Sequence, residues 1–425
     1  MKRMRIGVFA DTHVGRCIPR AVGELRRRAY RHAFTQAVNI FIKEGVDCLI
    51  HGGDMFEKRS MTPEESVFVK DELQRLADSV YDVYCKHVTM FAIRGNHDGT
   101  PENNALDYIK HPLAEYLKII GDEALQGKDE AEFRNGLLLI GVSYHPYISR
   151  KFEEIKARIK RGFEHGSELK ILLIHNFIKG HHQIPPGVPL HNCLDIRDLK
   201  DLKVDLIIAG HHHDRKESRM GDGTVLLTPG ATEAIDLSDE GSHGVYILEG
   251  KNSARFVPVK PLHEIRNIRV DSRENARPAK WFVDRATEMV DTHAYNVRAR
   301  DTKAVLRVLL LGSTDEDPFE IERLLASRLG KMKGSLSMIL HTELVNRVED
   351  MRQRSVPLTA SRAGVTSEIL TLPGNMSQEA TKIVEEVGMA LDERASQTTG
   401  LLTTSDRLPF VNRWISILEK AEATG

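Results

Sequence analysis

Short apolar runs, each followed at once by glycine and polar residues, recur through the first 250 residues of the chain. Apolar runs of this length, bounded by turn residues, are typical of buried β-strands. We therefore predict eight strands, at residues 5–10, 46–50, 88–93, 137–142, 170–174, 204–209, 225–227 and 245–248.

Segments with helical periodicity lie between the first of these predicted strands. Residues 29–44 place Ala33, Ala37 and Phe41 on one face, and Gly45 ends the pattern as a helix C-cap glycine does. Thr62-Pro63-Glu64-Glu65 is a typical helix start and predicts a helix to about residue 80. A third helix is predicted at about 105–119. Strand and helix alternate early, whereas hairpin-like strands follow later, which indicates a layered α/β sandwich on a mixed sheet.

The composition changes near residues 257–261, where Val257-Pro258-Val259-Lys260-Pro261 is a plausible hinge. The first domain is therefore expected to span residues 1–260. Residues 262–345 predict a smaller α+β domain with strands at 265–270, 304–311 and 336–340 and helices at 279–291 and 318–329. Residues 346–425 are expected to be mainly helical. Near the end, apolar residues at helical spacing predict an amphipathic helix that binds a partner or packs on its own chain: Phe410, Val411, Trp414, Ile415 and Leu418.

Composition indicates a soluble protein of the cytoplasm. The 425 residues are 41% hydrophobic, which supports two or three domains with real cores. The four cysteines are scattered, so a disulfide framework is not expected. We find no signal peptide and no apolar run long enough for a membrane span.

The formal net charge of −1 hides a basic N-terminal edge. Residues 1–35 hold nine Lys and Arg side chains against two acidic ones, Asp11 and Glu24. A basic edge favours a polyanionic substrate, although a run of this kind is often only a solvated face.

Seven residues of metal-binding type lie in order along the chain, nearly all at the ends of predicted strands. They are Asp11, His13, Asp54, Asn96, His175, His211 and His213. Strand-end loops meet at one edge of a sheet, so we expect these side chains to converge. Mixed nitrogen and oxygen ligands without a thiolate suit Mn, Mg, Fe or Zn.

These ligands divide between two divalent metal ions, which together can activate water and neutralise charge on a phosphodiester. Asp11, His13 and His213 would hold one ion, and Asn96, His175 and His211 the other. Asp54 is the candidate bridge, because one carboxylate can share its two oxygens. His97 follows a ligand directly and is the candidate general acid, and Asp98 would orient its imidazole. Each motif alone has a simple structural explanation, but their joint order favours the metal centre.

This ordered set resembles the calcineurin-like metallophosphoesterase superfamily. The flanking residues narrow the resemblance to the SbcD/Mre-eleven DNA double-strand-break repair nucleases, and the length suits the archaeal type. The segments that carry it are Gly53-Asp54-Met55-Phe56 with Pro63, Phe91-Ala-Ile-Arg-Gly-Asn-His-Asp98 and Thr228-Pro-Gly-Ala-Thr-Glu233. The resemblance implies a four-layer αββα sandwich over 1–260, a capping domain over the DNA groove at 262–345 and helices that bind an ATPase in 346–425.

The resemblance also implies an activity and partners. The expected enzyme is a manganese-dependent 3′–5′ exonuclease and single-strand endonuclease, acting on DNA ends with an SMC-like coiled-coil ATPase of the SbcC/Rad-fifty type. It would be associated with the nucleoid and form a homodimer through helices at about 64–80 and 103–119. Four residues of these helices would form a four-helix seam, or else face the core of their own chain: Phe68, Leu106, Ile109 and Leu113.

Three positions depart from the family pattern. Glu57 stands where many members have histidine, His212 separates two ligand histidines, and Ala231 replaces a frequent serine. None of these changes removes a ligand. Two other functions stay open: a metallophosphatase or cyclic phosphodiesterase on small substrates, and an inactive scaffold of the same fold. The retained His97 and seven ligands weigh against a scaffold.

Overall fold

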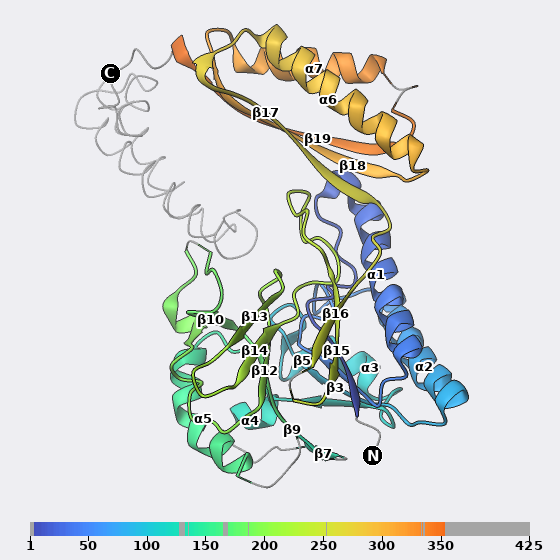
Figure 1. The fold of residues 1–425 in the computed structure, drawn as a ribbon, viewed down its shortest axis with the longest axis vertical. Helices are drawn as coiled ribbons and strands as arrows, with labels where there is room; N and C mark the ends of the chain where they lie inside the picture. Colours follow the sequence, from blue (N-terminus) through green and yellow to red (C-terminus); the bar gives the residue numbers. More distant parts are fainter. Residues whose placement is uncertain are drawn as a thin grey trace, which may run out of the picture.

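The computed structural model describes residues 4–352, except 127–131, 135, 165–168, 186, 252, 333 and 335. The predicted C-terminal helix with Phe410 and Trp414 lies outside the described residues. Figure 1 shows two sheets packed face to face with helices outside them, and a smaller α/β unit at one end.

The first sheet has six strands in the order β16-β15-β1-β2-β3-β6. Parallel pairing joins β1 to β2, β2 to β3 and β3 to β6, whereas β15 runs antiparallel to β1 and β16. The long helices α1 and α2 cover its outer face (Figure 1). The bounds are β16 Ala254–Pro258, β15 Gly244–Glu249, β1 Arg5–Phe9, β2 Cys48–His51, β3 Thr89–Ile93, β6 Leu117–Ile120, α1 Gly23–Glu44 and α2 Pro63–Tyr84.

The second sheet also has six strands, in the order β13-β14-β12-β9-β8-β7. Its central strands β14, β12, β9 and β8 are parallel, and α5 packs on its outer face with α4 beside it. The bounds are β13 Lys216–Arg219, β14 Val225–Thr228, β12 Leu206–Gly210, β9 Leu169–His175, β8 Leu137–Val142, β7 Glu132–Arg134, α5 Ile148–Gly162 and α4 Asp122–Leu125.

The inner faces of the two sheets share one apolar core. Val8, Ile50 and Phe91 of the first sheet pack in the same cluster as Ile171 and Ile208 of the second. Both faces of each central strand are therefore buried, which explains the nearly continuous apolar runs in the sequence. The predicted four-layer αββα sandwich is confirmed.

Short elements connect these layers. They are η1 Arg20–Val22, β4 Gly99–Thr100, β5 Asn103–Asn104, α3 Asp107–Lys110, β10 Phe177–Lys179, η2 Leu190–Asn192 and β11 Cys193–Asp195. Among the described residues, no helix is long and apolar enough to cross a membrane.

The long helices begin and end where local chemistry predicts. Thr62 and Glu65 form a reciprocal capping box at the start of α2, with Pro63 in the first turn. The helix α1 ends at Gly45, whose φ of 59° needs no Cβ penalty. Both predicted helices extend a few residues beyond the predicted bounds.

The helix predicted over 105–119 is wrong. Only Asp107–Lys110 forms the helix α3, and Leu117–Ile120 forms β6, which pairs with β3 at the sheet edge. Pro112 disfavours helical geometry at His111, and strand pairing outweighs the local apolar periodicity beyond it. The sequence prediction also omitted α5, which follows β8.

The predicted dimer seam is wrong for three of its four residues. Leu106, Ile109 and Leu113 are fully or almost fully buried in the core of their own chain, beneath α2. Phe68 is partly buried and packs edge-on against Phe34, with ring centroids 5.9 Å apart. Leu106, Ile109 and Leu113 thus face their own core and are not available to a second copy, whereas Phe68 is only partly buried.

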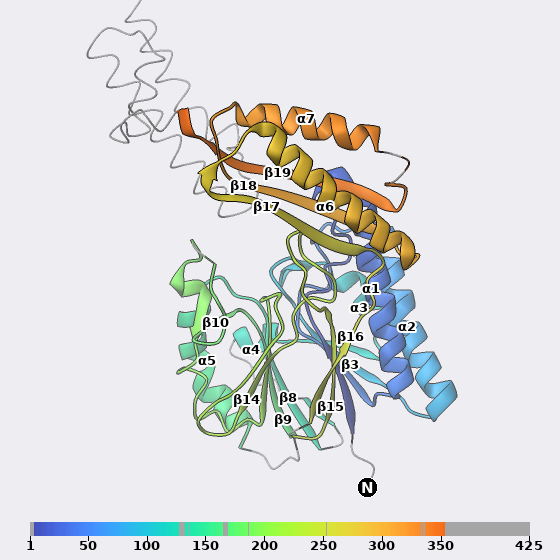
Figure 2. The same cartoon turned by 45° about the horizontal axis from the view of Figure 1, so that its top comes forward.

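The smaller unit is a three-stranded sheet in the order β17-β18-β19, with both pairs parallel. The helices α6 and α7 cross over on one face and bury a separate core, as Figure 2 shows. The bounds are β17 Glu264–Ala276, α6 Ala279–Ala299, β18 Ala304–Thr314, α7 Pro318–Lys331 and β19 Ile339–Asp350. All five elements overlap the predicted ones, although the last strand begins later and is longer.

This unit contacts the sandwich through an apolar cluster and through hydrogen bonds to a loop. Val305 of β18 packs against Val22 and Leu237. The backbone N–H of Asn267 donates to Glu240 Oε1 at 2.6 Å. The loop containing Glu240 therefore joins the unit to the sandwich.

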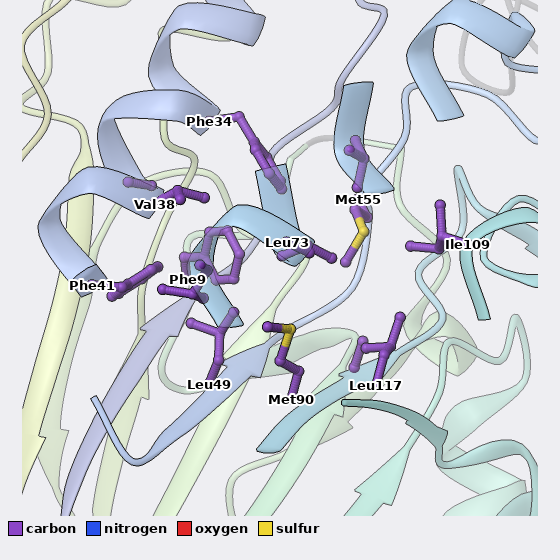
Figure 3. Close-up of a cluster of buried hydrophobic side chains, with 14 of the residues drawn as sticks. Phe9, Phe34, Val38, Phe41, Leu49, Met55, Leu73, Met90, Ile109 and Leu117 are labelled. Carbon is purple, nitrogen blue, oxygen red and sulfur yellow. The ribbon is translucent and has the colours of Figure 1, made fainter. Parts of the chain in front are cut away.

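The core under α1 and α2 contains a cluster of aromatic rings (Figure 3). The rings of Phe9 and Phe41 meet edge to face, with centroids 5.2 Å apart. Gly7 of β1 leaves room for this ring, since a Cβ there would lie 2.5 Å from Phe41 Cδ1. The strand can thus approach the helix closely.

Replacing this ring tests the packing. We expect Phe41→Ala to lower the free energy of unfolding by about 3–5 kcal/mol, because it leaves a cavity between α1 and the sheet. Val83→Ala on α2 is the control, since Val83 is 65% exposed and its loss is expected to change stability by less than about 0.5 kcal/mol. The midpoints of urea unfolding of the two variants measure this difference in stability, and equal midpoints would contradict the assigned packing.

Candidate metal centre

Five strands end at one place and bring the predicted residues together. The strands β1, β2 and β3 lead to Asp11, Asp54 and Asn96, and β9 and β12 lead to His175 and His211. All these strands except the last two belong to the first sheet, so the centre lies at the common carboxyl edge of both sheets. All seven predicted ligand residues lie together in one cluster at this edge.

The backbone at the centre is strained where the side chains must turn inward. Asp11, His13, Asp54 and His211 have φ values of 50°, 40°, 54° and 81°. Residues other than glycine seldom adopt positive φ, and those that do concentrate at functional sites. The loop geometry is held by hydrogen bonds, including Asp11 N–H to the Gly53 carbonyl at 3.0 Å.

His175 presents one ring nitrogen to a group of acceptor atoms. Its Nδ1 lies 2.7 Å from the carbonyl oxygen of Gly52, which can only accept, so Nδ1 carries the proton. Its Nε2 lies 3.2 Å from Asp54 Oδ2 and 3.3 Å from Asn96 Oδ1. A carboxylate oxygen, an amide oxygen and an imidazole nitrogen thus face one another.

His13 forms a second group of the same kind. Its Nδ1 lies 3.1 Å from Glu57 Oε2, so its Nε2 lone pair points the other way. That Nε2 lies 3.3 Å from Nε2 of His213 and 3.9 Å from Asp54 Oδ2. His213 Nε2 is also 4.0 Å from Asp11 Oδ1. Asp54 Oδ2 therefore lies within 4 Å of both histidine groups.

Burial decides the protonation of the remaining groups. It lowers the pKa of His211 to about 3 and that of His213 well below its usual range. Burial also raises the pKa of Asp11 well above its usual range, despite the nearby charge of His175. The histidines are thus neutral and offer lone pairs.

The pair of His175 and Asp54 behaves differently. Burial lowers the pKa of His175, but the charge and hydrogen bond of Asp54 outweigh it and raise the pKa to about 9. Burial likewise opposes the charge of Asp54, and His175 lowers the pKa of Asp54 well below its usual range. A proton on His175 therefore offsets the negative charge of Asp54. A metal cation between the two side chains would offset the same charge.

The donor set fits two divalent cations. Among the described residues, buried Asp54 Oδ2 has no hydrogen-bond donor unless His175 is protonated, which is costly unless a cation contacts it. Among the described residues, three triads have ligand atoms within 4.8 Å of one another: Asp11, His13 and His213; Asp54, His175 and His211; and His13, Glu57 and His97. The first two triads match the predicted division of ligands, and Asn96 adds an amide oxygen to the second.

The structure corrects the role predicted for Asp98. Its carboxylate is fully buried and accepts the backbone N–H groups of Phe56 at 3.0 Å and Gly95 at 2.9 Å. His97 Nδ1 lies instead 2.8 Å from the carbonyl oxygen of Glu57. The prediction that Asp98 orients the imidazole is therefore wrong, because its oxygens are committed to tying the two loops together.

Glu57 is the functional residue that sequence reasoning did not assign. Besides contacting His13, it accepts two hydrogen bonds from Arg16 Nη1, at 2.9 and 3.0 Å, and its carboxylate lies 3.9 Å from His97 Nδ1. Burial raises the pKa of Glu57, but its hydrogen bond with His13 and the charges around it outweigh burial and lower it. A carboxylate behind a ligand histidine orients the ring and makes it a stronger ligand. The sequence signal for such a role was that Glu57 stands where many members of the resembled family have histidine.

The Thr228–Glu233 segment supports the ligand loop from behind. Ala231 N–H donates to the carbonyl oxygen of His213 at 2.8 Å, and a Cβ on Gly230 would lie 2.6 Å from the same oxygen. His212 stacks on His182, with ring centroids 4.6 Å apart and planes 4° from parallel. His212 thus braces the loop between its two neighbouring ligand residues.

An open cleft of about 730 Å³ leads to the centre. His97, Asn96 and Asp54 lie on its lining, together with residues 183–185, Val188 and residues of the loop from Ile235 to Gly241. Its outer wall is acidic, with Asp236, Asp239 and Glu240 among the lining residues. The Glu240 carboxylate accepts from the β17 backbone, so part of this acidic wall serves the contact with the smaller unit.

The predicted basic N-terminal edge is partly neutralised by ion pairs. Five of its arginines are paired with carboxylates, four of which come from outside residues 1–35, whereas Arg20 and Arg28 are exposed. The pairs are Arg5 with Glu249, Arg16 with Glu57, Arg26 with Glu233, Arg27 with Glu24, and Arg31 with Glu64. Arg26 is also buried.

Comparison with known proteins defines the class of this centre. Residues 4–215 match the calcineurin-like phosphoesterase family. They include every predicted ligand, and the chain therefore carries a calcineurin-like metallophosphoesterase domain. The enzyme class implied by the sequence resemblance, a metal-dependent phosphoesterase, is confirmed.

Relatives narrow the resemblance further. The DNA double-strand break repair protein Mre11 of Methanosarcina mazei is 24% identical over 283 residues, which cover 64% of this chain and 41% of that protein. The protein of the same name from Sulfurisphaera tokodaii is 23% identical over 324 residues, covering 74% and 75%. The chain thus spans less than half of the first relative. A solved dimetal phosphatase from Danio rerio aligns with 61% of this chain and 100% of its own, at 13% identity and a TM-score of 0.39.

Gly95 offers a test of the geometry around Asp54. A Cβ at residue 95 would collide with Oδ1 and the backbone nitrogen of Asp54. We expect Gly95→Ala to weaken Mn²⁺ binding roughly 10- to 100-fold, as loss of support for a ligand does. Calorimetric titration measures this. Gly221→Ala is the control, because no atom lies within 4 Å of its added Cβ, and equal affinities in both variants would contradict the assigned geometry.

Proposed function

We propose that this chain is a two-metal DNA nuclease that processes DNA ends in double-strand-break repair. The observation that carries the proposal is the position of Asp54 Oδ2, between two groups of ligand atoms and beside the cleft that contains His97. Asp11, His13 and His213 would hold one cation, and Asn96, His175 and His211 the other. Asp54 would bridge them.

Two divalent cations, which we propose to be Mn²⁺, would supply Lewis acidity when bound and would neutralise charge on a phosphodiester. The protein supplies orientation. Gly52 fixes the tautomer of His175, and the Glu57 carboxylate lies 3.1 Å from Nδ1 of His13. Neutral imidazoles leave the centre with little negative charge of its own, which favours an anionic phosphate.

His97 is the proposed general acid. The Glu57 carbonyl accepts its Nδ1–H and fixes the ring, so Nε2 is the atom at which a proton is held or released. The side chain is 34% exposed and lines the cleft. A phosphodiester in the cleft could thus receive a proton on its leaving oxygen from this atom.

The substrate class rests on the relatives and the architecture. Both Mre11 relatives are named for DNA double-strand break repair. The β17–β19 unit stands over the sandwich (Figure 2) and is bonded to Glu240 of the cleft lining, so it would cap a bound duplex there. We extend the proposal to 3′–5′ exonuclease and single-strand endonuclease activity, a nucleoid location and an SMC-like ATPase partner. A homodimer is also proposed, through surfaces other than the buried Leu106, Ile109 and Leu113.

A second candidate is a phosphodiesterase acting on small substrates. The acidic wall at Asp236 and Asp239 favours it, because such a wall repels a long polyanion. The cleft volume also falls in the range of small-molecule sites. The decisive comparison is cleavage of linear DNA against bis-p-nitrophenyl phosphate in Mn²⁺. Hydrolysis of the ester alone would reject the nuclease and favour this alternative.

Two substitutions separate chemistry from metal binding. We expect His97→Gln to reduce cleavage of end-labelled DNA by roughly 10²- to 10⁴-fold, because it removes proton transfer, while both cations stay bound. Asp54→Ala is expected to lose metal occupancy, since it removes the shared carboxylate.

Activity on DNA labelled at each end and metal content by mass spectrometry provide the two measurements. Loss of one cation in the His97→Gln variant would show that His97 is a ligand and overturn its assignment. Full occupancy in the Asp54→Ala variant would remove the bridge from the proposed centre.

A further inference from the structure

We propose that the cavity at the N-terminal end of α5 binds an unpaired base of single-stranded nucleic acid. This inference rests on the proposed nuclease function and adds a substrate subsite outside the metal centre. The cavity has a volume of about 500 Å³ and is lined by His145, Tyr147, Arg150, Lys151, Glu154 and His191.

An exposed aromatic pair forms one side of this cavity. The rings of Tyr147 and His191 stack 4.9 Å apart with planes at 19°, and Tyr147 is 58% exposed. The neighbouring Leu190 is 68% exposed. The chain thus orders two rings in a stack and leaves the tyrosine accessible, which is the arrangement that binds a nucleobase by continuing the stack.

The charge beside the rings suits a phosphate backbone. The helix α5, residues 148–162, contains six Lys and Arg residues and two Glu residues, in a chain of net charge −1. Glu154 lies 2.9 Å from Lys151 Nζ and 3.7 Å from Arg150 Nε. The Arg150 side chain is 87% exposed, so its charge is available to an anion. Glu154 thus pairs with two of the basic side chains, and the helix as a whole keeps an excess of positive charge.

Hydrogen bonds connect this platform with the metal centre. Asn176 directly follows the candidate ligand His175 and is fully buried. Its Nδ2 donates to the carbonyl oxygens of His145 at 3.2 Å and Asn192 at 3.3 Å. These two residues precede Tyr147 and follow His191, so one buried side chain joins both segments of the platform to the end of β9.

A second contact continues the path across the surface. The Tyr144 ring lies 5.5 Å from the His211 ring and 6.3 Å from the His175 ring. Tyr144 is half-buried and begins the segment that leads to Tyr147. A strand leaving the cleft along this segment would meet the platform.

The chemistry favours a single strand over a duplex. A base inside a duplex has both faces covered by its neighbours, whereas an unpaired base can stack on Tyr147. Basic side chains beside the rings attract the backbone of either form, so stacking is the discriminating contact. The platform would therefore hold the unpaired part of a DNA end whose phosphodiester lies at the metal centre.

The test compares two tyrosines in otherwise similar surroundings. Tyr81 on α2 is 51% exposed and packs on His87 with ring centroids 4.9 Å apart, but α2 lies on the opposite outer layer (Figure 1). The full chain carrying His97→Gln is the background, because its cleavage of DNA in Mn²⁺ is expected to be roughly 10²- to 10⁴-fold slower. In that background, Tyr147→Ala and Tyr81→Ala are compared by fluorescence anisotropy with labelled oligothymidylate and a blunt duplex.

We expect Tyr147→Ala to weaken oligothymidylate binding about tenfold, a typical effect of losing one stacked base, and to leave duplex binding unchanged. Tyr81→Ala should change neither. An equal loss on both nucleic acids, no loss on oligothymidylate, or no measurable binding of oligothymidylate before substitution would each overturn the platform. Circular-dichroism melting verifies that both variants fold.

Arg150→Gln gives an independent reading. Loss of one backbone contact should reduce the slope of log affinity against log salt concentration by about 0.7 for a single strand. An unchanged slope would remove Arg150 from the site. Cleavage of DNA by the unsubstituted chain decides the nuclease proposal separately, so DNA cleavage without a Tyr147 effect would reject only the platform.

Discussion

The buried carboxylate of Asp54 is the group on which the rest of the centre depends. Its Oδ2 lies near Nε2 of His175 and Nε2 of His13, and no hydrogen-bond donor other than a protonated histidine satisfies it. Acceptor atoms brought this close repel one another unless positive charge lies between them. The sheets, the strained loops and the glycines at the strand ends hold these atoms in place.

Two kinds of support maintain that arrangement. Backbone groups fix the ligand rings, as the Gly52 carbonyl does for His175. Buried side chains then tie neighbouring loops together, as Asp98 does through the backbone of Phe56 and Gly95. A polar residue beside a ligand can therefore serve the centre without touching substrate. The same reasoning assigns Asn176 to the path between the centre and the surface platform, where it joins two segments that carry exposed rings.

Much of the fold and the ligand set could be predicted because both follow from local patterns. Apolar runs before Asp11, Asp54 and His175 indicate strands that are buried on both faces, and parallel strands collect their carboxyl ends at one edge. The helix predicted over 105–119 failed because β6 gains more from pairing with β3 than from its helical periodicity. The hydrogen-bond partners of His97 and Asp98 could not be predicted from their neighbouring positions in the sequence, because adjacent side chains in a loop point in different directions.

The sequence by itself determined which residues could ligate a metal, in what order, and that each follows a strand. Short-range periodicity and residue chemistry are enough for these conclusions. Only the tertiary structure decided how charges and rings are partnered. It paired Arg16 and Glu57 behind His13, and it placed Tyr147 on His191, 44 residues apart in sequence. Such contacts depend on which loops from distant strands meet in the fold. The order of residues along the chain does not give the distances between those loops.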